Sequence, residues 1–222
     1  MIDIKRFLQT LIIDNNMLAV RKKGVGVVEN ILMARTLMYS SVYFHKTVRI
    51  AELMLSKAIE MIHDAEPFDF FRMTDAELVS DMKRMGTFQY KIVTCLKYRK
   101  LFKQAFSASF TELNEQNVDI VKNLENVEPR REKEKEIEAE LNIPAGHIII
   151  DVPDRELRYA EPRIDQIDIA IIDENDIKKL NDFTPVVGAI KARATTDWSV
   201  MIVTDEKYRN IVSKNAEKIL FR

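Results

Sequence analysis

Cysteine, histidine and glycine are scarce in this chain of 222 residues, and each scarcity excludes a kind of site. The single cysteine, Cys95, excludes an internal disulfide and a cysteine-rich metal site. The three histidines, His45, His63 and His147, form no HxH or HxxxH pair of metal ligands. The five glycines do not make a P-loop or a GxGxxG phosphate cradle. Most stand-alone enzyme classes leave a clearer motif than any present here.

Long apolar runs are missing as well. No run approaches the roughly 20 residues that a membrane span needs. The first ten residues, MIDIKRFLQT, lack the apolar stretch and the small-residue cleavage site of a signal peptide. With 46% apolar and 31% charged residues, the composition is typical of a soluble globular protein. We therefore expect a cytoplasmic protein that makes no contact with a membrane.

Charge is divided unevenly along the chain. Residues 1–110 carry 17 basic and 11 acidic side chains (+6), and residues 111–222 carry 17 and 24 (−7), which sum to the net charge of −1. The positive half favours contact with phosphates or with an acidic partner; the alternative is that the two halves attract each other. Nucleic-acid binding is not favoured, because basic residues among aromatics, as in residues 97–103, more often form a wet amphipathic helix.

Periodicity predicts a mainly α fold, with a helical region over residues 1–104 followed by a smaller α+β lobe over residues 105–222. From Gly24 to about His63 the apolar residues recur at helical spacing without a proline. This stretch is one very long helix, or two helices with a break near Ser40-Ser41. Thr74-Asp75-Ala76-Glu77 is a capping box that predicts a helix ending at Gly86.

The second half mixes strands and helices. Asp205 is expected to cap the last helix of this half. In the first half, Asp14-Asn15-Asn16 predicts a turn. A charged helix is expected from residue 128 to 141, and we interpret its run Glu132 to Glu136 as a solvated face. Apolar runs predict strands at residues 106–110, 147–152, 167–172 and 199–204.

A basic segment precedes the long helical stretch. Arg21-Lys22-Lys23 stands directly before Gly24, whose missing side chain allows close approach of the backbone. A helix that starts there would add its positive N-terminal end to these cations. The functional hypothesis is an anion site; the alternative is a solvated basic loop followed by a core helix with interface salt bridges.

Further cations follow on one helix face. Arg35, Met38, Val42, His45 and Arg49 share that face, and Lys46 lies beside it. Arg35 and Lys46 are separated by roughly 16 Å at the helical rise per residue, too far to hold one phosphate together. They could serve two anion sites or two ion pairs.

These residues form a connected pattern that resembles a known family. It is similar to the helical region that follows the metal core in HD-superfamily phosphohydrolases related to the deoxynucleoside triphosphate triphosphohydrolases. The resemblance is strong over residues 18–60 and weak beyond. The segments that carry it are LAVRKKG at 18–24, Val28-Glu29, Ala34-Arg35, Met38-Tyr39, YFHKTVR at 43–49 and AELML at 51–55, with later fragments at 74–78, 130–132 and 150–153.

The resemblance implies a C-terminal portion without the metal site. The family's histidine and aspartate ligands lie upstream of the matched region, whereas His63-Asp64 lies downstream and is interpreted as the end of a helix. The resemblance therefore implies no catalytic residue and no metal ligand in this chain. A divalent metal is expected only if an upstream HD segment, such as a separate HD-containing chain, is supplied.

The resemblance also assigns roles to four cations. Arg35 occupies the place of an arginine that holds the nucleotide triphosphate in the catalytic pocket. Arg21, Lys23 and Lys46 look like residues that bind an effector nucleotide between subunits, which implies a homo-oligomer, at least a dimer. The alternative is a non-catalytic binding or assembly module with no nucleotide role.

Overall fold

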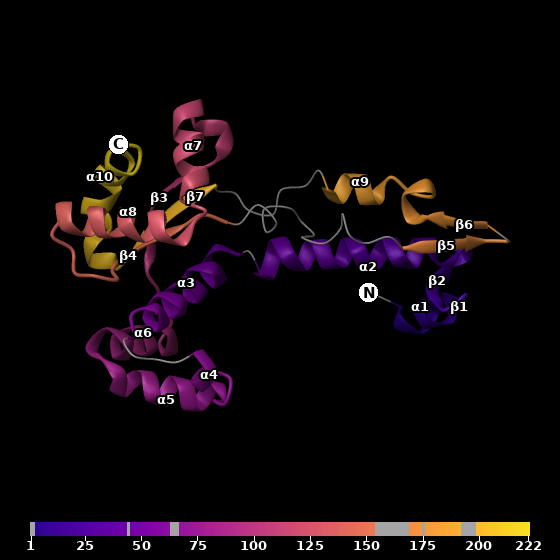
Figure 1. Ribbon diagram of the computed structural model, residues 1–222, viewed down its shortest axis with the longest axis horizontal. Coiled ribbons are helices and arrows are strands. Elements are labelled where there is room, and N and C mark those ends of the chain that lie inside the picture. Colours follow the sequence, from indigo (N-terminus) through magenta and orange to yellow (C-terminus); the bar gives the residue numbers. More distant parts are fainter. Residues whose placement is uncertain (1–2, 44, 63–66, 154–168, 175, 192–198) are drawn as a thin grey trace. The chain divides into compact units, whose positions relative to one another are not determined.

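The computed structural model describes residues 3–43, 45–62, 67–153, 169–174, 176–191 and 199–222 (Figure 1). The described residues are mostly helical with a smaller share of strand, which confirms the predicted mainly α class with a small mixed lobe. The chain divides into two compact units, the first formed by Met1–His45 with Asp154–Asp197 and the second by Lys46–Pro153 with Trp198–Arg222. The boundary expected after residue 104 falls inside the second unit, so the sequence pattern and the fold divide the chain differently.

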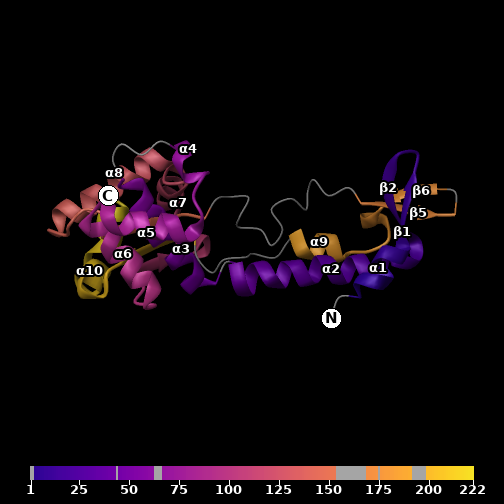
Figure 2. The ribbon, with the colours of Figure 1, turned by 90° about the horizontal axis from the view of Figure 1, so that it is seen from below.

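The first unit is a four-stranded sheet with helices. Strand order is β1-β2-β5-β6, and only the β2–β5 pair is parallel. The views of Figure 1 and Figure 2 agree in placing β1 and β2 beside β5 and β6. Its elements are α1 (Ile4–Thr10), β1 (Leu11–Asp14), β2 (Met17–Arg21), α2 (Val25–Met38), β5 (Ala170–Asp173), β6 (Asp176–Lys179) and α9 (Val186–Lys191).

One face of this sheet is buried by α2 and α9. Val20 and Ile171 of the sheet form a core with Leu32 of α2 and Val187 of α9. These positions are buried because an apolar strand face must be covered by another element. The strand face on the opposite side therefore carries the residues that alternate with Val20 and Ile171.

The long helical stretch is interrupted. A π-helical turn, Tyr39–Tyr43, follows α2, and α3 (Lys46–Glu60) begins shortly after it. The structure therefore selects the two-helix alternative, with the interruption around Ser40-Ser41. His63-Asp64, interpreted from the sequence as a helix end, lies outside the described residues.

The second unit has a three-stranded antiparallel sheet in the order β3-β7-β4, packed on both faces. Val200 and Ile202 of β7 face a core with α7, α8 and α10, and the alternate residues Met201 and Val203 face a core with α3, α5 and α6. Its further elements are α4 (Pro67–Phe70), α5 (Asp75–Met85), α6 (Thr87–Lys97), β3 (Lys103–Ala108), α7 (Glu115–Asn123), α8 (Val127–Glu140), β4 (Ile148–Asp151), β7 (Val200–Thr204) and α10 (Arg209–Leu220).

Helix ends in this unit follow local chemistry. Thr74 and Glu77 make both hydrogen bonds of the predicted capping box, and Gly86 ends α5. Asp205 accepts a hydrogen bond from the backbone N–H of Lys207 and caps the 3-10 turn Glu206–Tyr208, which leads directly into α10, whose own N-cap is Tyr208. Such ends are predictable because the partners are three residues apart or fewer.

Candidate functional site

The segment Arg21-Lys22-Lys23-Gly24 joins β2 to α2 and is fixed by its glycine. Gly24 is buried, and a Cβ atom at this position would lie 2.6 Å from Cβ and Oγ1 of Thr10 and 2.7 Å from Cγ1 of Val20. Only glycine fits at this distance without displacing its neighbours. The basic residues are thereby held against α1 and β2 rather than on a loose loop.

A basic hollow lies beside this segment. It has a volume of about 590 Å³ and is lined by Ile12, Arg21, Lys22, Lys23, Ile172 and Glu174. In the sheet, Arg21 pairs with Ile172 directly after the buried pair Val20 and Ile171. Since successive side chains alternate between the faces of a sheet, the floor of the hollow is the face turned away from α2.

The cations of the hollow differ in their partners. Lys22 Nζ lies 2.8 Å from Asp173 Oδ2, and the hydrogen bond and charge of Asp173 raise the pKa of Lys22 above its ordinary value. For Arg21 and Lys23 the described residues offer no side-chain hydrogen bond or ion pair. Two cations without a partner carboxylate in this part of the chain, beside two isoleucines, can therefore receive an anion that also has an apolar part.

Arg35 lies in the last turn of α2, away from the hollow. Its side chain is exposed, Nη2 donates a hydrogen bond of 3.2 Å to the hydroxyl oxygen of Tyr39, and Cζ lies 5.4 Å from the centre of the Tyr39 ring. Tyr39 in turn packs against Tyr43, with ring centres 5.2 Å apart. The guanidinium is thus oriented by the π-helical turn.

Lys46 begins α3 and is exposed. It belongs to the second unit, whereas Arg21 and Lys23 belong to the first. The family resemblance grouped Arg21, Lys23 and Lys46. Arg21 and Lys23 lie together at the hollow of the first unit, whereas Lys46 belongs to the second unit.

The second unit contains a charge network that the sequence did not reveal. Glu134 accepts a hydrogen bond of 2.8 Å from the Ile150 N–H and lies 2.5 Å from Lys57 Nζ. Glu138, one helical turn later, accepts from the Ile148 N–H at 3.1 Å. The two carboxylates therefore satisfy the outer N–H groups of β4, the edge strand of its sheet.

This network corrects the interpretation of Glu132 to Glu136 as a solvated face. Glu134 is 4% exposed and Glu138 is 7% exposed, because both share the face of α8 that also buries Ile137. Burial raises the pKa of both carboxyls, against the opposing effects of Lys57 and the strand N–H groups. The signal in the sequence was Ile137, whose position on the helix surface selects the same face.

Two further buried polar residues, Asp151 and His147, lie in this unit. Arg49 makes a two-pronged contact with Asp151, from Nε at 3.1 Å and Nη2 at 2.7 Å to Oδ1, so it is committed to an ion pair. His147 Nε2 lies 2.9 Å from Lys91 Nζ, which also contacts Asp205. Burial and the charge of Lys91 lower the pKa of His147 below 6.5. Both effects favour the neutral form of the ring.

Neither a metal site nor a membrane span is present in the described residues. They contain no group of three or more histidine, cysteine, aspartate and glutamate side chains that could hold a metal ion. In the same part of the chain, no helix is both long and apolar enough to cross a membrane.

Comparison with protein-family models gives a match to the family described as HD associated region, over residues 2–221. The chain belongs to this HD-associated family. The match confirms the coarse relation to the HD superfamily that the sequence pattern indicated.

Relatives of the HD-associated region are about twice its length. This chain is 28% identical to an uncharacterized protein of Methanocaldococcus jannaschii, over 98% of this chain and 47% of that protein. A hypothetical protein from Aquifex aeolicus has the same fold, with a TM-score of 0.64 at 22% identity over 96% of this chain and 51% of that one. A phosphohydrolase from Bacteroides thetaiotaomicron matches with a TM-score of 0.60 at 17% identity, over 93% and 56%. The chain thus spans about half the length of these proteins.

Proposed function

We propose that this HD-associated region supplies phosphate contacts and an oligomer contact to an HD-type nucleoside triphosphate phosphohydrolase, and that it is not catalytic alone. The observation that carries the proposal is the basic hollow with Arg21 and Lys23. The resemblance to the deoxynucleoside triphosphate triphosphohydrolases names the same two residues as effector ligands. The metal-activated water of such a reaction would come from an HD segment outside this chain, together with its divalent metal.

The lining of the hollow suits a nucleotide. The planar guanidinium of Arg21 can hold two phosphate oxygens at once, and the ammonium of Lys23 adds a point charge. Ile12 and Ile172 offer an apolar surface to a base or a sugar ring. The carboxylate of Glu174 can accept a hydrogen bond from a hydroxyl or amino group.

Arg35 would serve a second phosphate. Ten residues of helix separate it from Val25 at the start of α2, which corresponds to about 15 Å. Its exposed guanidinium, oriented by Tyr39, is in keeping with a ligand contact in the catalytic pocket, the role that the resemblance gives it.

The test is nucleotide binding by the intact chain. Isothermal titration with ribo- and deoxynucleoside triphosphates should show binding that the double variant Arg21→Ala/Lys23→Ala weakens by about tenfold or more, since two charge-assisted contacts are lost. Lys214→Ala, which removes an exposed lysine of α10, is the matched control and should bind like the wild type. Equal binding by all three proteins would contradict the assignment of the hollow.

Arg35→Ala separates the second site from the first. It should reduce triphosphate binding or turnover, once an HD segment is supplied, without lowering the melting temperature. A large loss of melting temperature with unchanged binding would instead make Arg35 a structural residue.

A second candidate is a binding or assembly module with no nucleotide role. It is favoured by α2, where Met33, Leu37 and Met38 are exposed although the opposite side of the helix is buried in the first unit. A helix that is apolar on several sides is usually covered by another element. A separate HD-containing chain could cover it. Stable assembly without any nucleotide binding would favour this candidate.

A further inference from the structure

β1 lies at an edge of the sheet among the strands that the structure describes. Three of its four residues are apolar, and the side chain of Ile13 is 74% exposed. Leu18 of β2, which pairs with Ile13, is 63% exposed. Within the described part of the chain, this edge therefore combines backbone groups that pair with no further strand with an apolar surface.

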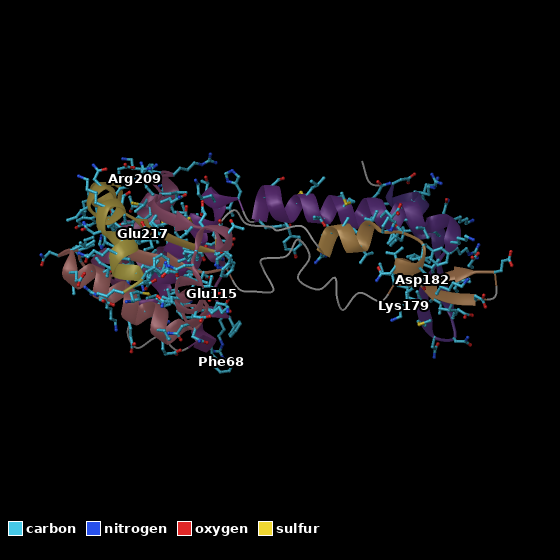
Figure 3. All side chains as sticks on the ribbon, turned by 90° about the horizontal axis from the view of Figure 1, so that it is seen from above. Phe68, Glu115, Lys179, Asp182, Arg209 and Glu217 are labelled. Atoms are coloured by element: carbon cyan, nitrogen blue, oxygen red, sulfur yellow. The ribbon has the colours of Figure 1, made fainter. Side chains whose placement is uncertain are left out.

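The opposite edge, β6, has a different character. Its sequence, Asp176-Ile177-Lys178-Lys179, carries three charges in four residues, and all four side chains are exposed. Lys179, at the end of this strand, is labelled in Figure 3. Charged side chains, lysine above all, prevent an edge strand from pairing with another strand. β1 has no lysine, so this protection is confined to β6.

The hairpin determines which groups of β1 point outward. Asn15 and Asn16 have φ of 48° and 62°, the positive values of a two-residue turn of type I′. In such a hairpin the residues next to the turn, Asp14 and Met17, exchange hydrogen bonds, and the next pair does not. The N–H and C=O of Ile13 therefore point away from β2.

Leu11, the next residue with outward groups, is partly engaged. Its N–H donates to the carbonyl oxygen of Leu8 at the end of α1. Among the residues that the structure describes, nothing pairs with the outward N–H and C=O of Ile13, so Ile13 is the residue of β1 that offers both a donor and an acceptor on its outer side.

We infer that β1 pairs antiparallel with β1 of a second copy of this chain, with Ile13 of each copy facing the other at a twofold axis. Each Ile13 N–H would donate to the Ile13 carbonyl oxygen of the other copy, because an antiparallel edge is complementary to itself under twofold rotation. The exposed side chains of Ile13 and Leu18 from both copies would then cover one another. Two sheets of four strands would become one continuous sheet.

The pairing has a consequence for the basic hollow, and this consequence alone rests on the proposed function. With Ile13 at the axis, Asp14 of the second copy would lie opposite Ile12, which lines the hollow. A ligand in the hollow would then contact both copies. The pairing itself requires no nucleotide.

The experiment is sedimentation of the full chain over a range of concentrations. Ile13→Pro removes the outward N–H without touching a hydrogen bond between β1 and β2, and Ile13→Lys places two ammonium groups together at the axis. Each should weaken dimerisation by about tenfold or more, from the loss of two hydrogen bonds or the added repulsion. Circular dichroism and melting temperature establish that the variants remain folded.

The matched controls are Ile177→Pro and Ile177→Lys. Ile177 pairs with Ile172, and this pair is the second from the turn of the β5–β6 hairpin, as the pair of Ile13 and Leu18 is in the β1–β2 hairpin. These variants should dimerise like the wild type. In a Cys95→Ser background, Ile13→Cys should also be linked between copies by a short bifunctional thiol reagent, and Ile177→Cys should not.

The outcomes separate this inference from the proposed function. A folded Ile13→Pro or Ile13→Lys protein that assembles like the wild type overturns pairing through β1, while the proposed oligomer remains. A wild-type chain that is monomeric at every concentration overturns this inference and the proposed oligomer contact, while the proposed phosphate contacts are decided by nucleotide binding. Loss of assembly in the Ile13 variants alone, with triphosphate binding measured separately, supports the inference whatever the hollow binds.

Discussion

Glu134→Gln is the substitution whose effect follows most directly from the structure. Glu134 contacts Lys57 at 2.5 Å, and the two side chains are 5% and 10% exposed. Lys57 also lies 3.1 Å from Glu60, which is 30% exposed. Burial, the largest single effect, lowers the pKa of Lys57, but the charges and hydrogen bonds of Glu134 and Glu60 together outweigh it, and the pKa is raised. Glutamine keeps an oxygen for the Ile150 N–H and removes the charge.

Removal of one partner from a buried ion pair costs about 3–5 kcal/mol. Because Glu60 still faces Lys57, we expect the lower end, about 3 kcal/mol of unfolding free energy. The double variant Lys57→Met/Glu134→Gln removes both charges and keeps the acceptor for Ile150, so it should return to within about 1 kcal/mol of the wild type. Glu132→Gln, an exposed glutamate on the same helix, should change stability by less than about 0.5 kcal/mol.

The assay is urea unfolding followed by circular dichroism, with the free energy extrapolated to water. The wild type, Lys57→Met, Glu134→Gln and the double variant form a double-mutant cycle, and Glu132→Gln is a separate control. A loss below about 1 kcal/mol for Glu134→Gln, or a double variant whose loss equals the sum of the single ones, would refute the reasoning.

Gly24→Ala should lower the unfolding free energy by about 1–3 kcal/mol, because the new Cβ would lie 2.6 Å from Thr10 atoms. Gly188→Ala in α9, which would meet no atom within 4 Å, should instead raise it by about 0.5–1 kcal/mol; equal urea midpoints would contradict this. The pKa of His147 is lowered in the folded chain. As the pH decreases below 6.5, the unfolded chain therefore binds a proton that the folded chain does not, and the free energy of unfolding decreases. The contribution of His147 to this slope, at most about 1.4 kcal/mol per pH unit, should be lost in His147→Gln, and an unchanged slope in urea titrations would contradict the lowered pKa of the imidazole beside Lys91.

Much of the fold was predictable because its signals are local. The capping box of Thr74 and Glu77 and the turn at Asn15-Asn16 involve residues at most three positions apart, and both were found where the sequence placed them. β6 and α9 were not predicted. The sequence of β6, DIKK, has no alternation of apolar and polar residues that would predict a strand. This segment is a strand because it pairs with β5.

The candidate site was predictable only in part. Arg21 and Lys23 were selected by the family resemblance, within the basic run before Gly24, and both line the hollow. Ile172 and Glu174 could not be assigned to it, since they reach β2 through a parallel pairing about 150 residues away in the chain. The role of Asp173 as the partner of Lys22 depends on the same pairing.

The sequence by itself determined both ends of α5, the turn of the first hairpin and the family, since these depend on neighbouring residues and on residue identity. Only the tertiary structure decided that Glu134 is buried and that Lys22 is neutralised by Asp173. It also decided which faces of the strands are covered. The physical reason is that burial and ion pairing depend on the element that packs opposite a residue, and that element lies far away in the chain.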